Sequence, residues 1–154
     1  SAYVVNGSEV GSDKFEYKKA WLDGLLKDCE GWLAQYPNLA LVGDYNIAPD
    51  DRDVHDPKAW EGQVLCSPEE RSRFNTLLGM GLVDSFRLFE QAEKTFSWWD
   101  YRMLGFQKNK GLRIDHVLLS KPLAQRCIAS VIDRVPRKWE KPSDHAPAIA
   151  TLTA

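Results

Sequence analysis

The sequence predicts a mixed α/β or α+β layered domain. The chain has 154 residues, which suits one domain or part of one. Hydrophobic residues make up 44% of it and charged residues 27%, which excludes a disordered or collagen-like chain and allows a buried core. A helical pattern, an apolar strand and a second helical pattern are followed mostly by strand-like runs. That order is typical of sheets layered against helices.

The first predicted element is a helix over about 14–35. Apolar residues recur there at helical spacing, and Asp13 with Glu16 resembles a capping box. A short apolar run over 39–43 follows and predicts a buried strand. Residues 44–66 then form a long polar segment, and a loop of this length in a compact domain is commonly functional or disordered.

The second predicted helix has the strongest start signal in the chain. Ser67 is a typical cap, Pro68 fits the first helical position, and Glu70 completes a capping box. We expect the helix to end at Gly79 or Gly81. The remaining elements are predicted as strands at 82–86, 95–101, 112–119, 128–135 and 146–152, with a short helix near 122–127.

Charge and cysteine content narrow the function classes. The net charge of −2 excludes a uniformly basic protein that coats nucleic acid. The segment from Arg102 to Lys141 nevertheless holds ten Lys or Arg and three acids, so its local charge of +7 can approach a polyanion. The three cysteines are far apart, which argues against a disulfide framework and fits a reducing compartment. No apolar stretch is long enough to span a bilayer, so we expect a cytoplasmic protein without a membrane partner.

The motif Gly43-Asp44-Tyr45-Asn46 is the first candidate site, because it follows the predicted apolar strand. A strand end presents polar side chains into a crevice. There Asp44 can act as a base or bind a cation, and Asn46 can donate to a phosphoryl oxygen. Gly, Asp and Asn also favour turns, so an ordinary turn is the alternative.

Two further motifs carry charged side chains beside apolar runs. Arg113 and Asp115 lie within a predicted strand, so Asp115 should have a partner; a surface-facing charged row is the alternative. Asp144 and His145 precede the last predicted strand. Because an acid can fix the tautomer of an imidazole and hold it positively charged, we expect Asp115 to bond His145 in the crevice that Asp44 faces.

Other chemistries are less well supported. No Gly-x-Ser-x-Gly motif is present and Ser143 has no evident oxyanion hole, which argues against acyl transfer. The three histidines have irregular spacing, which argues against zinc. Trp98 and Trp99 lie in a predicted strand, where neighbouring side chains face opposite sides. One of them should therefore face outward, where it can stack on a nucleotide.

Seven motifs, in order along nearly the whole chain, resemble the exonuclease III family of DNA-repair nucleases. They are YVVNG (3–7), GDYNIAP (43–49), SPEER (67–71), GLVDSFR (81–87), FSWWDYR (96–102), GLRIDH (111–116) and EKPSDHAP (140–147). The resemblance implies half of the endonuclease/exonuclease/phosphatase fold, a sandwich of two packed sheets with helices outside. It also implies Mg²⁺- or Mn²⁺-dependent cleavage of double-stranded DNA, at abasic sites and from 3′ ends.

The resemblance also implies roles for individual residues. Asp44 matches the acid that orients or deprotonates the attacking water, and Asn46 matches a phosphate-binding amide. His145 matches an imidazole that contacts the phosphate, with Asp115 as its partner. The other matches are Tyr3 and Asn6 beside the scissile phosphate, Asp144 with Asp44 as metal-site acids, Trp98 as an aromatic residue that enters the DNA, and Arg113 as a substrate contact.

The resemblance covers the C-terminal part of the family's catalytic domain only. In that family the N-terminal half supplies a metal-binding Glu and a nearby Asn, so we expect residues 1–154 to lack that half and to be inactive or nearly so alone. We expect strands 39–43, 112–119 and 146–152 to expose an apolar sheet face that the missing half normally covers, so the isolated chain should form a two-fold dimer. The alternative is that the chain's own helices fold over and cover this face.

Two other functions stay open at this stage. The first is a phosphoesterase of the same superfamily that acts on a phosphoinositide or sphingomyelin. The second is a non-catalytic half that binds DNA or serves as a scaffold. A DNA substrate also implies association with the nucleoid, if the source is a bacterium.

Overall fold

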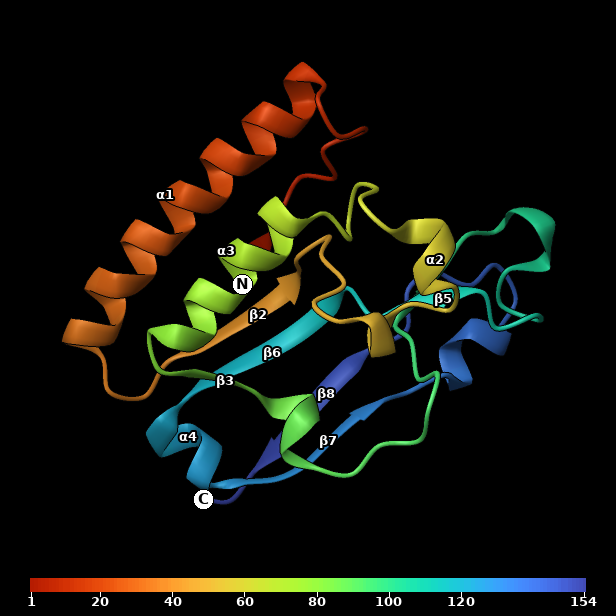
Figure 1. Ribbon diagram of the computed structural model, residues 1–154. Coiled ribbons are helices and arrows are strands. Elements are labelled where there is room, and N and C mark those ends of the chain that lie inside the picture. The colour runs from red at the N-terminus through yellow and green to blue at the C-terminus, as the bar shows by residue number, and fades with distance from the viewer.

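A four-stranded sheet forms the centre of the computed structural model, which describes residues 1–154 (Figure 1). The strands lie in the order β1 (Ala2–Tyr3), β2 (Ala40–Asp44), β6 (Asp115–Ser120) and β3 (Leu82–Asp84). β6 pairs antiparallel with β2 and β3, whereas β1 runs parallel to β2. A parallel pair needs a crossover connection, and the helix between β1 and β2 supplies it. The predicted mixed α/β class is confirmed.

Two helices, α1 (Asp13–Gln35) and α3 (Pro68–Gly79), cover one face of this sheet (Figure 1). The main core lies between helices and sheet and contains Val4, Leu22, Leu25, Cys29, Leu41, Tyr45, Ile47, Phe74, Leu77, Leu82 and Leu118. The capping box of α3 is present as predicted. For α1 the predicted cap is wrong by one position, because Ser12 Oγ accepts the hydrogen bond from the Phe15 N–H.

The remaining strands form two short ribbons. β7 (Cys127–Ile132) and β8 (Ala148–Leu152) pair antiparallel, and β8 lies against β6. β4 (Trp98–Trp99) pairs with β5 (Gly111–Leu112). The short helices are α2 (Pro57–Trp60) and α4 (Lys121–Gln125), and single 3₁₀ turns lie at Asp51–Asp53, Ser85–Leu88, Arg102–Leu104 and Val135–Lys138.

The strands predicted at 128–135 and 146–152 are each shorter by two residues, as Cys127–Ile132 and Ala148–Leu152. Three other predicted strands are shorter or interrupted, because their backbone groups bond elsewhere. The strand predicted at 82–86 ends at Asp84, whose carboxylate caps the 3₁₀ turn that follows. The strand predicted at 112–119 is interrupted, since Arg113 N donates to Asp53 O and Ile114 N donates to Ser97 Oγ. The strand predicted at 95–101 is reduced to the two residues of β4.

The predicted apolar surface is found on one of the three named strands only. α1 and α3 cover one face of β2 and β6, and Val42 and Val117 on the other face are half-buried. The β7–β8 ribbon instead exposes Ile128, Val131 and Ile149, at 59%, 49% and 43%. The dimer stays a prediction. None of the helices is both long and apolar enough to cross a membrane.

A buried ion pair joins four parts of the chain. Lys18 Nζ on α1 contacts Glu70 Oε1 on α3, and both side chains are fully buried. The ammonium also donates to Asn6 O at 3.0 Å and to Asn46 O at 2.7 Å. The Glu70 carboxylate accepts hydrogen bonds from the backbone N–H groups of Leu65 and Ser67 and from the Ser67 hydroxyl. Both buried ions therefore have hydrogen-bond partners that replace water.

The space for this ammonium depends on a glycine. Gly7 has a φ of +90°, which favours glycine, and a Cβ built there would lie 2.8 Å from Lys18 Cδ. Burial lowers the pKa of Lys18, and the charge of Glu70 opposes that shift.

We predict that Lys18→Met lowers the free energy of unfolding by about 3–5 kcal/mol, because it leaves the Glu70 carboxylate buried without its cation. Urea denaturation measures this. Lys19→Met is the matched control: Lys19 pairs with the exposed Glu16 carboxylate, so its loss should cost about 1 kcal/mol or less. Similar losses for the two variants would contradict the assigned importance of the buried pair.

Candidate functional site

Three side chains from distant parts of the chain meet at one end of the sheet. Asp44 ends β2, Asp115 begins β6, and the two residues lie opposite each other in the strand register. His145 comes from the loop before β8. His145 Nδ1 lies 2.8 Å from Asp115 Oδ2, and His145 Nε2 lies 3.8 Å from Asp44 Oδ2. The predicted hydrogen bond between Asp115 and His145 is confirmed.

These contacts fix the state of the imidazole. An ionised carboxylate only accepts hydrogen bonds, so His145 Nδ1 carries the proton and Nε2 points toward Asp44. Burial opposes a charged ring, but the hydrogen bond and charge of Asp115, with the charges of Asp44 and Asp144, raise the pKa of His145 above its ordinary value. Burial, followed by the nearby charge of Asp115, raises the pKa of Asp44 to about 6.

The cluster opens into a cavity of about 480 Å³, which Val42, Val117, Pro136, Ser143, Pro147 and Ala148 also line. Gly43 shapes its edge, because a Cβ there would lie 1.8 Å from Ala2 O and would prevent β1 from pairing with β2. That pairing places Tyr3 in register with Asp44. Tyr3 is 68% exposed, so it stands beside the carboxylate and faces solvent.

The two predicted asparagines lie near Asp44 in the chain fold but differ in environment. Asn46 is buried, its side chain donates from Nδ2 to Val4 O at 2.7 Å, and its backbone N–H donates to Asp44 Oδ1 at 2.8 Å. Asn46 thus orients Asp44 and holds the segment before α1, and one of the two hydrogens of its side-chain amide is used in doing so. Asn6 is exposed, and its Oδ1 accepts from Ser8 N. Phosphate contacts by either residue stay a prediction.

Three side chains hold the loop that carries His145. Trp98 Nε1 donates to Asp144 Oδ2 at 3.0 Å, and Tyr101 donates from its hydroxyl to Pro142 O at 2.6 Å. Arg137 donates to Ser143 O at 2.5 Å, with its guanidinium 5.7 Å from the centre of the Trp99 ring and 4.7 Å from that of Phe106. The imidazole is therefore held by a loop with fixed backbone carbonyls.

The two tryptophans differ in burial as predicted: Trp99 is fully buried, and Trp98 is half-buried next to the site. Asp144 lies outside the central cluster, because its Oδ2 binds Trp98 and its Oδ1 is 4.0 Å from His145 Nε2.

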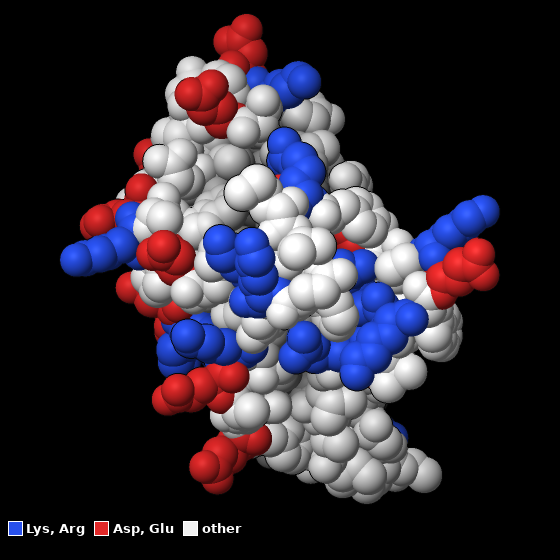
Figure 2. Space-filling model, turned by 90° about the vertical axis from the view of Figure 1, so that its right-hand side faces the viewer, with Lys and Arg blue, Asp and Glu red and all other residues white.

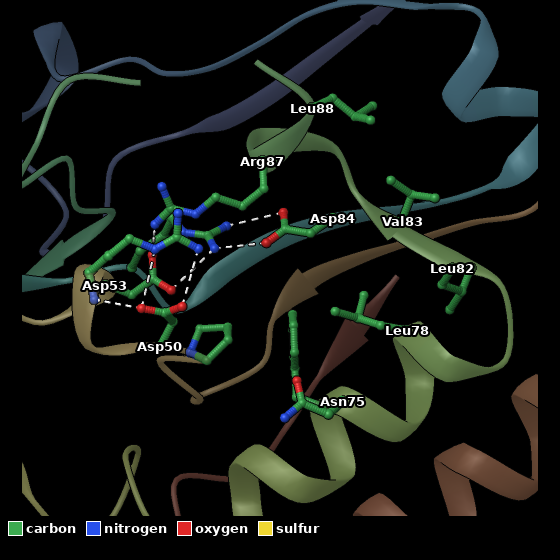
Figure 3. A pocket seen from close by; sticks show the side chains of 13 residues that line it. Asp50, Asp53, Asn75, Leu78, Leu82, Val83, Asp84, Arg87 and Leu88 are labelled. Atoms are coloured by element: carbon green, nitrogen blue, oxygen red, sulfur yellow. Dashed lines mark hydrogen bonds and ion pairs between the residues drawn. The ribbon is translucent and has the colours of Figure 1, made fainter. Parts of the chain in front are cut away.

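Arg113 is placed away from the crevice, so its predicted substrate contact is wrong. Its side chain is 2% exposed and bonds Asp53 and Asp84. These two acids and Arg87 converge beside another cavity, of about 380 Å³ (Figure 3). A guanidinium enclosed by two carboxylates avoids the cost of an unpaired buried charge. The pKa of Asp84 is lowered, because burial, which would raise it, is outweighed by the charge and hydrogen bonds of Arg113.

Sequence patterns did not identify Lys18, Tyr101 or Arg137 as supports of the site. For Lys18 a signal was available: it lies among the apolar residues of α1, where a buried lysine requires a partner. Tyr101 and Arg137 carried no such signal, since their partners are backbone carbonyls, those of Pro142 and Ser143, and every residue has a carbonyl.

The residues that could hold a metal are Asp44, Asp115 and His145, whose ligand atoms lie within 4.8 Å of one another. Mg²⁺ and Mn²⁺ prefer oxygen ligands, and Mg²⁺ sites commonly use one or two carboxylates. The carboxylates of Asp44 and Asp115 fit that donor set. The predicted metal roles of Asp144 and Asp44 stay predictions: Asp144 Oδ1 lies 4.0 Å from His145 Nε2, and Asp44 Oδ2 lies 3.8 Å from it.

We predict that Asp44→Asn stabilises the fold above about pH 6 by about 1–3 kcal/mol, because the folded state raises the pKa of this carboxyl from 3.8 to about 6. In the native chain that group's contribution is lost as pH rises through this window. Thermal unfolding at about pH 4 and pH 8 measures it, with the exposed Asp28→Asn as control. Equal stability of Asp44→Asn and native chains at pH 8 would contradict it.

Comparison with known proteins supports one family. Residues 3–145 match the Endonuclease/Exonuclease/phosphatase family. The chain is 41% identical to exodeoxyribonuclease III from Haemophilus influenzae over 157 residues, covering 94% of this chain and 59% of that protein. A solved structure of a variant of the 3′ phosphatase NExo from Neisseria, bound to a product DNA hairpin, matches this chain with a TM-score of 0.97 and 39% identity. The match covers 99% of this chain and 60% of that protein.

A third relative extends the comparison. An AP endonuclease from Archaeoglobus fulgidus matches 99% of this chain and 60% of its own length, with a TM-score of 0.93 and 33% identity. The chain thus spans about three fifths of these relatives. The resemblance to the exonuclease III family is confirmed, and this chain belongs to the endonuclease/exonuclease/phosphatase family.

Proposed function

We propose that this chain forms part of a DNA-repair phosphodiesterase that cleaves duplex DNA at abasic sites and from 3′ ends. The observation that carries the proposal is the cluster of Asp44, Asp115 and His145, open to a cavity at the end of the sheet. Phosphodiester hydrolysis needs a base for the attacking water and stabilisation of charge on the phosphoryl oxygens. The cluster offers a group for each task.

Asp44 is suited to the role of base, because its pKa of about 6 lies near neutral pH. When His145 is protonated on both nitrogens, it can donate from Nε2 to a phosphoryl oxygen while Nδ1 stays bonded to Asp115. Asp115 thereby orients the ring and balances its charge. A bound Mg²⁺ or Mn²⁺, held by the Asp44 and Asp115 carboxylates, would stabilise negative charge on the phosphate.

Surface charge supports DNA as the partner. Figure 2 shows Lys and Arg side chains gathered across the middle of one face, on the side where α2 and β5 lie in Figure 1. Of the ten basic residues between Arg102 and Lys141, Arg113 and Arg137 are buried, and the other eight are exposed. Exposed cations bind the DNA backbone without reading sequence. Trp98 is half-buried and lies beside His145, which supports its proposed contact with a base or an abasic gap.

The proposal extends to the activity of the isolated chain. About two fifths of each relative's length lies outside the match. From the resemblance, the N-terminal half supplies a metal-binding Glu, so little cleavage is expected without it. The three free cysteines support a location in the reducing cytoplasm, in association with the nucleoid if the source is a bacterium.

We predict Mg²⁺-dependent nicking of an abasic duplex by the chain combined with the N-terminal half expected from the resemblance, and much less by the chain alone. The rate should fall as pH rises above the raised pKa of His145, because the ring then loses the proton that it donates to the phosphate. Gel assays of labelled duplex across pH measure this fall.

Asp44→Asn should lower this rate by about 10²–10⁴-fold, whereas the exposed Asp28→Asn should not. Phosphoinositide and sphingomyelin substrates serve as the comparison panel. Preferential cleavage of a lipid headgroup would favour the other phosphoesterase function. DNA binding without cleavage by the combined protein would favour a non-catalytic half.

We also predict self-association of the isolated chain through the β7–β8 ribbon, because Ile128, Val131 and Ile149 are exposed there. Sedimentation velocity over a concentration series should show a monomer–dimer equilibrium, and Val131→Lys should weaken it. A strict monomer at all concentrations would contradict this expectation, and loss of the dimer on adding the N-terminal half would identify that half as the preferred partner.

A further inference from the structure

A second histidine, His116, lies directly after Asp115 on β6 but points into the core. It is 2% exposed. Its ring packs edge-on against Tyr45 and Phe74, with ring centres 5.2 Å and 4.9 Å away. An imidazole in such apolar surroundings needs partners for both nitrogens.

The partners of His116 fix its tautomer. A nitrogen of the Arg113 guanidinium lies 3.2 Å from His116 Nδ1, and a guanidinium can only donate. Nδ1 is therefore the acceptor, and Nε2 carries the proton. His116 Nε2 lies 2.8 Å from Ile47 O, which accepts that proton in a hydrogen bond. Burial, followed by the charge of Arg113, lowers the pKa of His116 to about 4, so the ring stays neutral near pH 7.

Arg113 is itself held rigidly. Its Nε and one terminal nitrogen donate to Asp53, both terminal nitrogens donate to Asp84, and its backbone N–H donates to Asp53 O. The two acids and the neighbouring Arg87 are drawn together in Figure 3. The donor that selects the His116 tautomer is therefore fixed from two sides.

The carbonyl that His116 holds belongs to the turn after Asp44. Asn46 in this turn has a φ of +48°, a conformation that costs energy in a residue with a side chain. The carbonyl of Asn46 accepts from Lys18 Nζ, and the next carbonyl, of Ile47, accepts from His116. Two consecutive carbonyls are thus held by two buried donors, and the Asn46 N–H bonds the Asp44 carboxylate.

We propose that His116 is a positioning residue: through Ile47 O it holds the left-handed turn at Asn46, and thereby holds the Asp44 carboxylate toward His145 and the cavity. The catalytic part of this inference rests on the proposed function. The positional part does not, because the hydrogen bond acts on the turn whether or not DNA is cleaved.

The test compares His116→Phe, which keeps an aromatic ring and loses the donor, with His116→Gln, which can donate to Ile47 O and accept from Arg113. Amide hydrogen exchange by NMR should be faster in His116→Phe at Asn46 and Ala48, by up to about tenfold, the equivalent of one net hydrogen bond. Exchange in the β7–β8 ribbon should not change. His116→Gln should restore the native rates.

The matched control is His55→Phe, because His55 Nδ1 also bonds a backbone carbonyl, that of Gly111, away from the turn. It should leave exchange at Asn46 unchanged. In the protein combined with the N-terminal half, His116→Phe should lower kcat by about tenfold or more with little change in KM, and His116→Gln should recover it.

Two results would overturn the inference. One is unchanged exchange at Asn46 and Ala48 in a folded His116→Phe variant. The other needs no variant: ¹⁵N shifts of the native chain that show a neutral ring with its proton on Nδ1 would exclude the assigned hydrogen bond from Nε2 to Ile47 O. A native protein that cleaves no DNA would contradict the proposed function, while the exchange result would still decide the role of His116.

Discussion

The buried contact between Lys18 and Glu70 determines how the chain closes on itself. Coulomb attraction between two ions is strong in the protein interior. Removing the ions from water nevertheless costs several kcal/mol each, unless their remaining hydrogen-bond donors and acceptors also find partners. Here backbone groups of three segments supply those partners: the segment before α1, the turn after β2 and the start of α3. The hydrogen bonds of this ion pair therefore fix the positions of these three segments relative to one another.

Near the candidate site, buried charged and neutral polar groups also have hydrogen-bond partners within the protein. Arg113 satisfies Asp53 and Asp84 on one side and selects the His116 tautomer on the other. Buried polar groups of this kind contribute modestly to net stability, but each admits only one geometry, since an alternative would leave a donor or acceptor unpaired. These buried hydrogen bonds therefore restrain the conformations of the loops that form the crevice.

Sequence patterns predicted the parts of this structure that depend on local chemistry. The capping box at Ser67 and the opposite exposure of Trp98 and Trp99 follow from hydrogen bonds and side-chain alternation within a few residues. The bond between Asp115 and His145 was also predicted, because a buried acid needs a partner. Arg113 was assigned to substrate, since spacing cannot show that Asp53, sixty positions away, already holds it. The short strands were missed for the same reason: distant groups compete for their backbone.

The strand register that places Asp44 opposite Asp115 affects the stability of the fold. Two carboxylates side by side repel, and burial increases the repulsion, so the crevice is a region of negative potential. Whatever positive charge enters, whether a divalent ion, a proton on His145 or both, relieves it. Cation binding and folding are therefore linked, because a cation that binds the folded crevice stabilises the folded state.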